Sequence, residues 1–218
     1  MKDLHALLEW AKEEGLISHF PNFKVPTYIA KVHPILSEDQ VRFLLHELKG
    51  RDLVIFACYY YTGKRGGEVV ALRWKDFDFK NDTITFKRQR TAGKVKDTLK
   101  TPKSKNEIDL SPELKTILLA WQPECGSLTW LFPGRNDKPI GTDTWRCRWK
   151  EIKKQYGFPE DLRPHDMRHS HATHALKDGI RVEVLSKRLG HSKVSTTLNR
   201  YAHVTVEDMK KASRMVGK

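Results

Sequence analysis

The run DLVIFACYYYT, residues 52–62, constrains the fold more than any other stretch, because it is apolar on almost every side of a helix. Other elements have to cover such a helix on several sides. Gly63 follows directly and ends the helix. The chain has 218 residues, and single domains usually have roughly 100–200 residues. The run therefore predicts a buried central helix inside one substantial domain.

Further helices are predicted on both sides of this run. Ser37 can cap a helix, and Gln40 three residues later can reach back to it. Ser111 and Pro112 occupy the cap and first-turn positions of another helix. The later part of the chain is also predicted to be helical, with helix starts near Thr142, Pro164, Arg181 and Thr205.

The periodicity changes between Phe77 and Leu110. The segments FDFKNDTITFKRQR, VKDTLK and NEIDL alternate apolar or β-branched residues with polar ones, and Asn-Asp and Gly turns separate them. This pattern predicts a small antiparallel sheet of about three strands. The expected fold class is therefore α+β, mainly α-helical with a small antiparallel three-stranded sheet.

The N-terminal segment is organised differently. Residues 4–14 carry leucines at helical spacing, and Gly15 follows as a stop. In the next segment, SHFPNFKVPTYIAKVHP, three prolines and two phenylalanines interrupt any period. We expect residues 1–30 to be the end of an upstream domain with a linker, and residues 31–218 to form the main domain with its C-terminal tail.

The charge of the chain indicates a polyanionic partner. Lys and Arg number 40 against 27 Asp and Glu, which gives a net charge of +13. The excess is spread along the chain and is not confined to a tail, so nucleic acid is the favoured partner. On composition alone, a ribosome-like or merely soluble basic protein remains an alternative.

The cysteines and the apolar segments indicate in which cellular compartment the protein is found. The three cysteines are widely spaced and form no C-x-x-C pair, which argues for a reducing environment and against a disulfide framework or a thiolate zinc site. No run approaches the roughly 18 apolar residues of a membrane span. The N-terminus carries acids where a signal peptide would be basic. We expect a cytoplasmic protein without a membrane partner.

The stretch RPHDMRHSHATH, residues 163–174, holds four histidines. At about 100° per residue, His165, Arg168 and His169 share one arc of a helix, whereas His171 and His174 lie on the far side. Zinc needs three or four converging ligands, so we expect no metal site. Packing or surface roles are favoured for the last three histidines. His165 with Arg168, at the start of a helix, predicts an anion site.

Two other segments carry residues suited to phosphate chemistry. In TGKRGGE, Arg65 follows the glycine break, and Glu68 lies one turn away and can hold its guanidinium. In LGHSKVSTTLNRYAHV, His191 follows a glycine turn and Tyr201 comes ten residues later. Taken alone, the first pair reads more simply as a surface ion pair and Tyr201 as a packing residue.

These pieces resemble the tyrosine recombinase family, also called phage integrases. Its pattern is an Arg in a T-G-x-R-x-x-E box, a Lys on a β-hairpin, H-x-x-R, and L-G-H followed by Tyr. Over about residues 35 to 205 the matching positions, in the expected order, are Arg65, Lys100, His165, Arg168, His191 and Tyr201. In TLKTPKSKNEIDL, Lys103 remains the alternative to Lys100. The residue between Gly and Arg in the first box is usually apolar in the family, but here it is Lys64.

The resemblance implies the tyrosine recombinase catalytic-domain fold and site-specific DNA recombination or integration through a 3′-phosphotyrosyl intermediate. It also implies that no metal, ATP or other cofactor is needed. A tyrosine hydroxyl has a pKa near 10, so only about 0.1% is phenolate at neutral pH, and the nucleophile needs help. The implied helpers are Arg65 and Arg168 on the phosphate oxygens, His191 as a further donor, His165 for the tyrosine proton and Lys100 as general acid.

The resemblance further implies double-stranded DNA with specific recombination sites as the partner, and self-association on DNA as a tetrameric synapse. Residues 1–30 resemble the end of the family's core-binding domain, so weak DNA binding is expected. The tail VEDMKKASRMVGK can form an amphipathic helix that docks on a neighbouring subunit or packs on its own domain. The predicted DNA contacts are Lys64, Arg88, Arg90, Lys94, Lys96, Lys103 and Lys105.

Two other functions remain compatible with these residues. A type IB topoisomerase would use the same pocket to relax supercoils without exchanging strands between partners. A DNA-binding protein of another class could carry the residues without using their chemistry. A covalent protein–DNA product that depends on Tyr201 separates an enzyme from a binding module.

Overall fold

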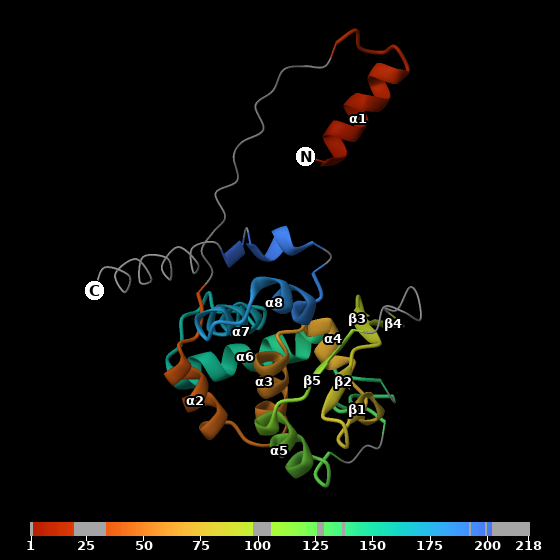
Figure 1. Cartoon of the computed structure of the whole chain (residues 1–218). Helices are drawn as coiled ribbons and strands as arrows, with labels where there is room; N and C mark the ends of the chain where they lie inside the picture. The colour runs from red at the N-terminus through yellow and green to blue at the C-terminus, as the bar shows by residue number, and fades with distance from the viewer. Residues whose placement is uncertain are drawn as a thin grey trace, which may run out of the picture. The chain divides into compact units, whose positions relative to one another are not determined.

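Figure 1 presents the computed structural model of the chain, which describes residues 2–19, 34–97, 106–125, 129–136, 138–191, 193–198 and 200–201. The chain divides into two compact units, Met1–Val32 and His33–Lys218. The predicted lysines at 100, 103 and 105 lie outside the described residues, as does the predicted tail helix. Those predictions stay untested.

The first unit contains one helix, α1 (Lys2–Glu13), where the leucine spacing predicted it. Gly15 follows in the left-handed conformation, with φ 69°. Large apolar side chains of this helix are exposed within the unit, among them Leu4, Leu7 and Trp10.

The second unit is mainly helical. Helix α3 (Gly50–Thr62) is buried continuously from Val54 to Tyr59 and contacts four other helices, so the prediction of a buried central helix is confirmed. Figure 1 shows it surrounded by the others. The same unit contains α2 (Glu38–Glu47), α4 (Gly66–Val70), α5 (Pro112–Trp121), α6 (Thr142–Tyr156), α7 (Asp166–Lys177), α8 (Val182–Leu189) and the short 3-10 helix η1 (Trp74–Asp76), and residues 194–198 and 200–201 are also helical.

The predicted helix caps are present. The Ser37 side chain accepts a hydrogen bond from the Gln40 N–H, and the Gln40 side chain accepts one from the Ser37 N–H, which completes a capping box. Ser111 caps α5 in the same way, with Pro112 in its first turn. These local bonds satisfy N–H groups that the helix itself leaves without partners, which is why the starts could be read from the sequence.

The strands form two separate sheets. Strands β1 (Phe77–Asp78), β2 (Thr83–Thr85) and β5 (Glu107–Asp109) make the predicted antiparallel sheet of three strands, in the order β1-β2-β5. Strands β3 (Arg88–Thr91) and β4 (Lys94–Asp97) form a second, two-stranded sheet that was not predicted as separate. The pairing of β2 with β5 ends at Asn106, whose carbonyl oxygen accepts a hydrogen bond from the Phe86 N–H. In the described residues beyond this point, β3 pairs only with β4.

Close backbone contact holds β3 against α4. A side-chain Cβ at Gly67 would lie only 2.6 Å from the carbonyl oxygen of Arg90, so no larger residue fits there without movement. The glycine therefore lets the start of α4 and the hairpin approach each other directly.

The second unit has a large apolar core and a smaller second one. The smaller core joins α7, α8 and the chain after them, and its members are Ala172, Ala175, Leu176, Leu185, Leu189 and Tyr201. Among the described helices, none is both long and apolar enough to cross a membrane.

Candidate active site

Arg65 lies in the turn between α3 and α4, as the N-cap of α4. Its backbone N–H donates to Glu68 Oε2 at 2.8 Å, and its Nη1 lies 3.9 Å from Glu68 Oε1. The Glu68 side chain is 7% exposed, whereas that of Arg65 is 49% exposed. The buried Glu68 carboxylate thus holds the backbone of Arg65 in place and lies near its guanidinium. The guanidinium keeps a face open to solvent.

Gly63 allows this turn to pass against α7 and α8. Its φ is 61°, in the left-handed region, where it caps α3. A Cβ at this position would come within 2.5 Å of the His171 ring and 2.9 Å of Leu189. The glycine is therefore needed both for its backbone conformation and for the close approach that brings Arg65 toward α7.

The Arg168 side chain extends from α7 to the turn that precedes Arg65. Its guanidinium is buried, and it donates from Nη1 to the carbonyl oxygen of Gly63 at 2.8 Å and from Nη2 to His191 Nε2 at 2.7 Å. Burial, together with the charge of Arg65, lowers the pKa of Arg168 to about 10. Arg168 thus contacts His191 directly, and the charge of Arg65 acts on both groups, although the three residues come from distant segments.

The bond from Arg168 also assigns the ring protons of His191. A guanidinium has donors only, so Nε2 accepts and the proton of a neutral ring is on Nδ1. From Nδ1 the ring donates to Thr197 Oγ1 at 2.7 Å. Burial and the charges of Arg168 and Arg65 lower the pKa of His191 to about 4, so the ring is neutral near neutral pH.

Tyr201 is packed in the smaller core and is 3% exposed. Its hydroxyl lies 2.9 Å from His169 Nδ1. Burial raises the pKa of Tyr201 to about 12, although Arg168 and Arg200 act in the opposite direction. The phenol is therefore neutral near neutral pH, and the imidazole beside it is placed to accept its proton.

His169 is a candidate functional residue that sequence reasoning missed, because packing was the favoured interpretation of this histidine. It is buried, 6% exposed, and its ring lies edge-on to that of His165, with 5.0 Å between the centroids. His165 itself is exposed at the N-cap of α7. The signal was present in the helix arc that His169 shares with His165 and Arg168.

The other two histidines of the cluster pack as expected. His174 Nδ1 lies 3.0 Å from the Tyr60 hydroxyl. His171 packs against Gly63, and burial lowers its pKa to about 3. Within the part of the chain that the structure describes, no group of three or more His, Cys, Asp or Glu is arranged to hold a metal ion.

Lys64 does not lie on the surface, where the prediction of a DNA contact had placed it. Its side chain is 0% exposed, its Nζ donates to Asn106 Oδ1 at 2.5 Å, and it lies over the Phe86 ring at 5.0 Å. Burial lowers the pKa of Lys64 to about 7. The prediction of a DNA contact at Lys64 is therefore wrong for this structure, because the side chain is enclosed by Asn106, Phe86 and their neighbours.

The predicted DNA contacts of the hairpin differ in their accessibility. Arg88 is 8% exposed and forms a buried ion pair with Asp76, so its side chain does not face solvent in this structure. Arg90 donates to the carbonyl oxygen of Pro139. Lys94 and Lys96 on β4 are exposed. These two lysines are the hairpin cations that a DNA backbone could reach directly.

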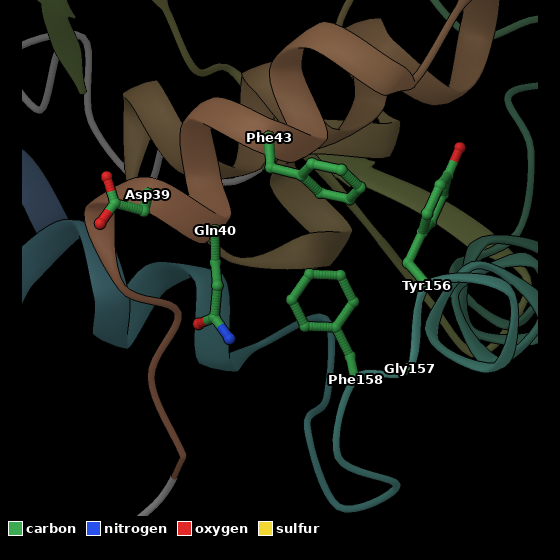
Figure 2. A pocket seen from close by; sticks show the side chains of 6 residues that line it. All are labelled: Asp39, Gln40, Phe43, Tyr156, Gly157 and Phe158. Atoms are coloured by element: carbon green, nitrogen blue, oxygen red, sulfur yellow. The ribbon is translucent and has the colours of Figure 1, made fainter.

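A surface pocket lies apart from these residues. It has a volume of about 340 Å³ and is lined by residues from α2 and from the end of α6 and the turn after it. Figure 2 shows Phe43, Tyr156 and Phe158 around it. None of the predicted site residues lines the pocket, so the candidate site is the cation and histidine cluster and not this hollow.

A family model and several known proteins match this chain over most of its length. The model of the phage integrase family matches residues 34–208. The tyrosine recombinase XerA of Pyrococcus furiosus is 30% identical over 215 residues, which cover 96% of this chain and 71% of that protein. The tyrosine recombinase XerC of Xanthomonas campestris pv. campestris (strain B100) is 27% identical over 211 residues, 93% of this chain. This chain spans 62% of the length of that XerC.

Two solved structures show the same fold. The Tn1549 transposon integrase, in complex with a circular intermediate DNA, is 22% identical with a TM-score of 0.78, over 97% of this chain and 77% of that one. The crystal structure of XerA recombinase is 24% identical with a TM-score of 0.67, over 87% of this chain and 67% of that one.

Proposed function

We propose, because this chain belongs to the phage integrase family, that it cleaves and rejoins DNA strands through a covalent bond between Tyr201 and a 3′ phosphate. One observation carries the proposal. The Arg168 guanidinium donates to His191 and is affected by the charge of Arg65 from a distant turn, while Tyr201 lies against His169 on the same helix as Arg168.

The cations are suited to the transition state of this reaction. Attack on a diester adds negative charge to the two non-bridging oxygens, and preorganised donors at such oxygens are each worth roughly 10² to 10³ in rate. Arg65 has an open face to solvent, and Arg168 presents a fixed fork beside it. The two would bind the diester and stabilise the added charge, and His191 would donate a further hydrogen bond.

The proton of the nucleophile would go to a neighbouring imidazole. In the cleavage step the Tyr201 oxygen forms a bond to phosphorus, and its proton passes to His169 Nδ1, which lies 2.9 Å away. His165, edge-on to that ring, would position it. This divides the role that the sequence assigned to His165 alone between the two histidines.

Departure of the 5′ oxygen completes the cleavage step. The bond from phosphorus to the 5′ oxygen breaks, and that oxygen takes a proton from Lys100 or, alternatively, from Lys103. A 5′ hydroxyl of a partner strand later attacks the phosphotyrosine and gives its proton to the lysine amine, while the bond from phosphorus to Tyr201 breaks and Tyr201 regains its proton from His169. Because the covalent link conserves the energy of the diester bond, the reaction needs no ATP, and no step in it requires a metal.

We further propose double-stranded DNA with specific recombination sites as the partner, and assembly of four subunits on paired sites. The charge of +13 supports a polyanionic partner. The three cysteines are free, which fits a reaction in the reducing cytoplasm.

The test is a duplex with a nick close to the cleavage site, so that a short 5′ fragment is lost after attack and the covalent product accumulates. Candidate sites come from the DNA flanking the coding region. We expect a protein–DNA band that survives denaturant and forms equally in a chelator. Tyr201→Phe should abolish it, whereas Tyr156→Phe, a matched change in the distant pocket, should not. A wild-type protein that binds the duplex but never forms the band would contradict the proposal.

A further inference from the structure

His191 carries its proton on the wrong nitrogen for the role that the reaction gives it. In this structure Nε2 accepts from Arg168 and Nδ1 donates to Thr197 Oγ1. A phosphate oxygen can only accept, so a ring in this tautomer has no hydrogen to offer it from Nε2. The proton position that the contact with Arg168 imposes on the ring therefore does not suit a bound diester.

Binding of a diester changes what Nε2 faces. The Nη2 group of Arg168 would then donate to a phosphate oxygen and no longer to the ring. Nε2 would need a hydrogen to make its own bond to that oxygen. With the ring neutral, one proton is released from Nδ1 to water while another is taken up at Nε2 from water, with no change in net charge.

Thr197 is the group that can serve both states. It is completely buried, with 0% exposure, and its Oγ1 lies 2.7 Å from Nδ1, so water does not replace it freely. A hydroxyl both donates and accepts, whereas a carboxylate or a carbonyl would accept only and would hold the proton on Nδ1. We propose that Thr197 is a positioning residue that accepts from His191 Nδ1 in the free protein and donates to it when DNA is bound.

This inference rests on the proposed function, but its first consequence concerns the free protein alone. The pKa of His191, lowered to about 4 by burial and by the neighbouring arginines, disfavours a doubly protonated ring near neutral pH in the free protein. An exchange of tautomers supplies a donor at Nε2 without adding a charge to the ring.

The direct test is the ring nitrogen signal of His191. Long-range ¹H–¹⁵N spectra of histidine-labelled Tyr201→Phe protein would be recorded without DNA and with an intact duplex, and His191→Gln would assign the signal. We expect the Nδ1–H form in the free protein and the Nε2–H form in the complex. An Nε2–H form already present without DNA would overturn the inference, as would an Nδ1–H form that persists with DNA.

The second test compares two adjacent threonines. Thr197→Val keeps the shape but leaves Nδ1 without a partner in a buried place, so we expect formation of the covalent product to slow by roughly 10-fold or more. Thr197→Ser restores the hydroxyl and should stay within about 2-fold of wild type. Thr196→Val makes the same change at an exposed position and serves as the control.

Two results of that comparison count against the inference. One is an equal loss in both valine variants, and the other is a serine variant as slow as Thr197→Val. If wild type forms no covalent product at all, the proposed function fails instead, and the tautomer in the free protein still tests the contact with Thr197.

Discussion

Arg168 donates a hydrogen bond to the carbonyl oxygen of Gly63, 105 positions earlier in the chain. The contact joins α7 to the turn that carries Arg65, and the same guanidinium reaches His191. One side chain thus sets the distance between three of the proposed catalytic groups.

Replacing Arg168 with lysine should therefore slow cleavage by roughly 10² or more, because an ammonium cannot span the carbonyl and a phosphate oxygen as a planar fork does. The measurement is the rate of covalent product on the nicked duplex. Arg188→Lys is the control, since Arg188 is half-buried and, like Arg168, donates to main-chain carbonyls, those of Tyr61 and Asp109. Equal losses in both variants would mean that Arg168 acts only through stability.

His169→Phe should slow cleavage by roughly 10² or more, because the phenol of Tyr201 loses the group that accepts its proton. His174→Phe removes the same kind of bond, to Tyr60, away from the nucleophile. Both variants should lose roughly 1–3 kcal/mol of unfolding free energy from an unpaired hydroxyl. Urea denaturation checks the stabilities, and only the first variant should lose cleavage beyond that shared effect. Normal cleavage by His169→Phe would refute its role.

Lys64 should make the stability of the protein depend on pH. Its pKa is about 7 in the fold against an ordinary value of 10.5, so between these values the unfolded chain binds more protons and raising the pH favours the fold. Relative to Lys64→Met, the unfolding free energy of wild type should rise from pH 7 to pH 9, with a slope approaching about 1.4 kcal/mol per pH unit. Urea titrations at three pH values give this difference. Parallel pH profiles for the two proteins would contradict this prediction, because they would show that folding does not lower the pKa of Lys64.

Lys96→Gln should weaken DNA binding and lower the salt dependence, with a change of about 0.9 in the slope of log affinity against log salt for each lost phosphate contact. The residue is exposed on β4, where a backbone could reach it. Fluorescence anisotropy at several salt concentrations measures the slope. Lys150→Gln, an exposed lysine on α6, is the control. If both variants change the slope equally, the hairpin has no special part in binding.

The elements that followed from the sequence are those whose cause is local. Apolar residues on every side of α3, the Ser37 capping box and the glycine after Thr62 act within a few residues, and each is present as predicted. That Arg65, Arg168 and His191 belong to one catalytic site stays a prediction, which came from the order in which they match a known family pattern.

The features that the sequence did not reveal depend on contacts between distant segments. A lysine inside a basic stretch reads as a surface residue, and only the packing of Phe86 and Asn106 around Lys64 shows that it is buried. In the same way, nothing within α7 itself indicates that Tyr201 ends beside His169, 32 positions earlier. The close approach of Gly67 to the backbone of Arg90 in the hairpin is likewise a long-range contact.

Tyr201 is a core side chain as well as the proposed nucleophile, since it packs with Leu185 and Leu189. Carrying its ring outward to a DNA strand would leave a hole between α7 and α8, and the energy of that hole becomes part of the activation barrier. A more stable small core would then slow catalysis. A variant that tightens the packing around the ring would therefore have a higher melting temperature and a lower turnover rate.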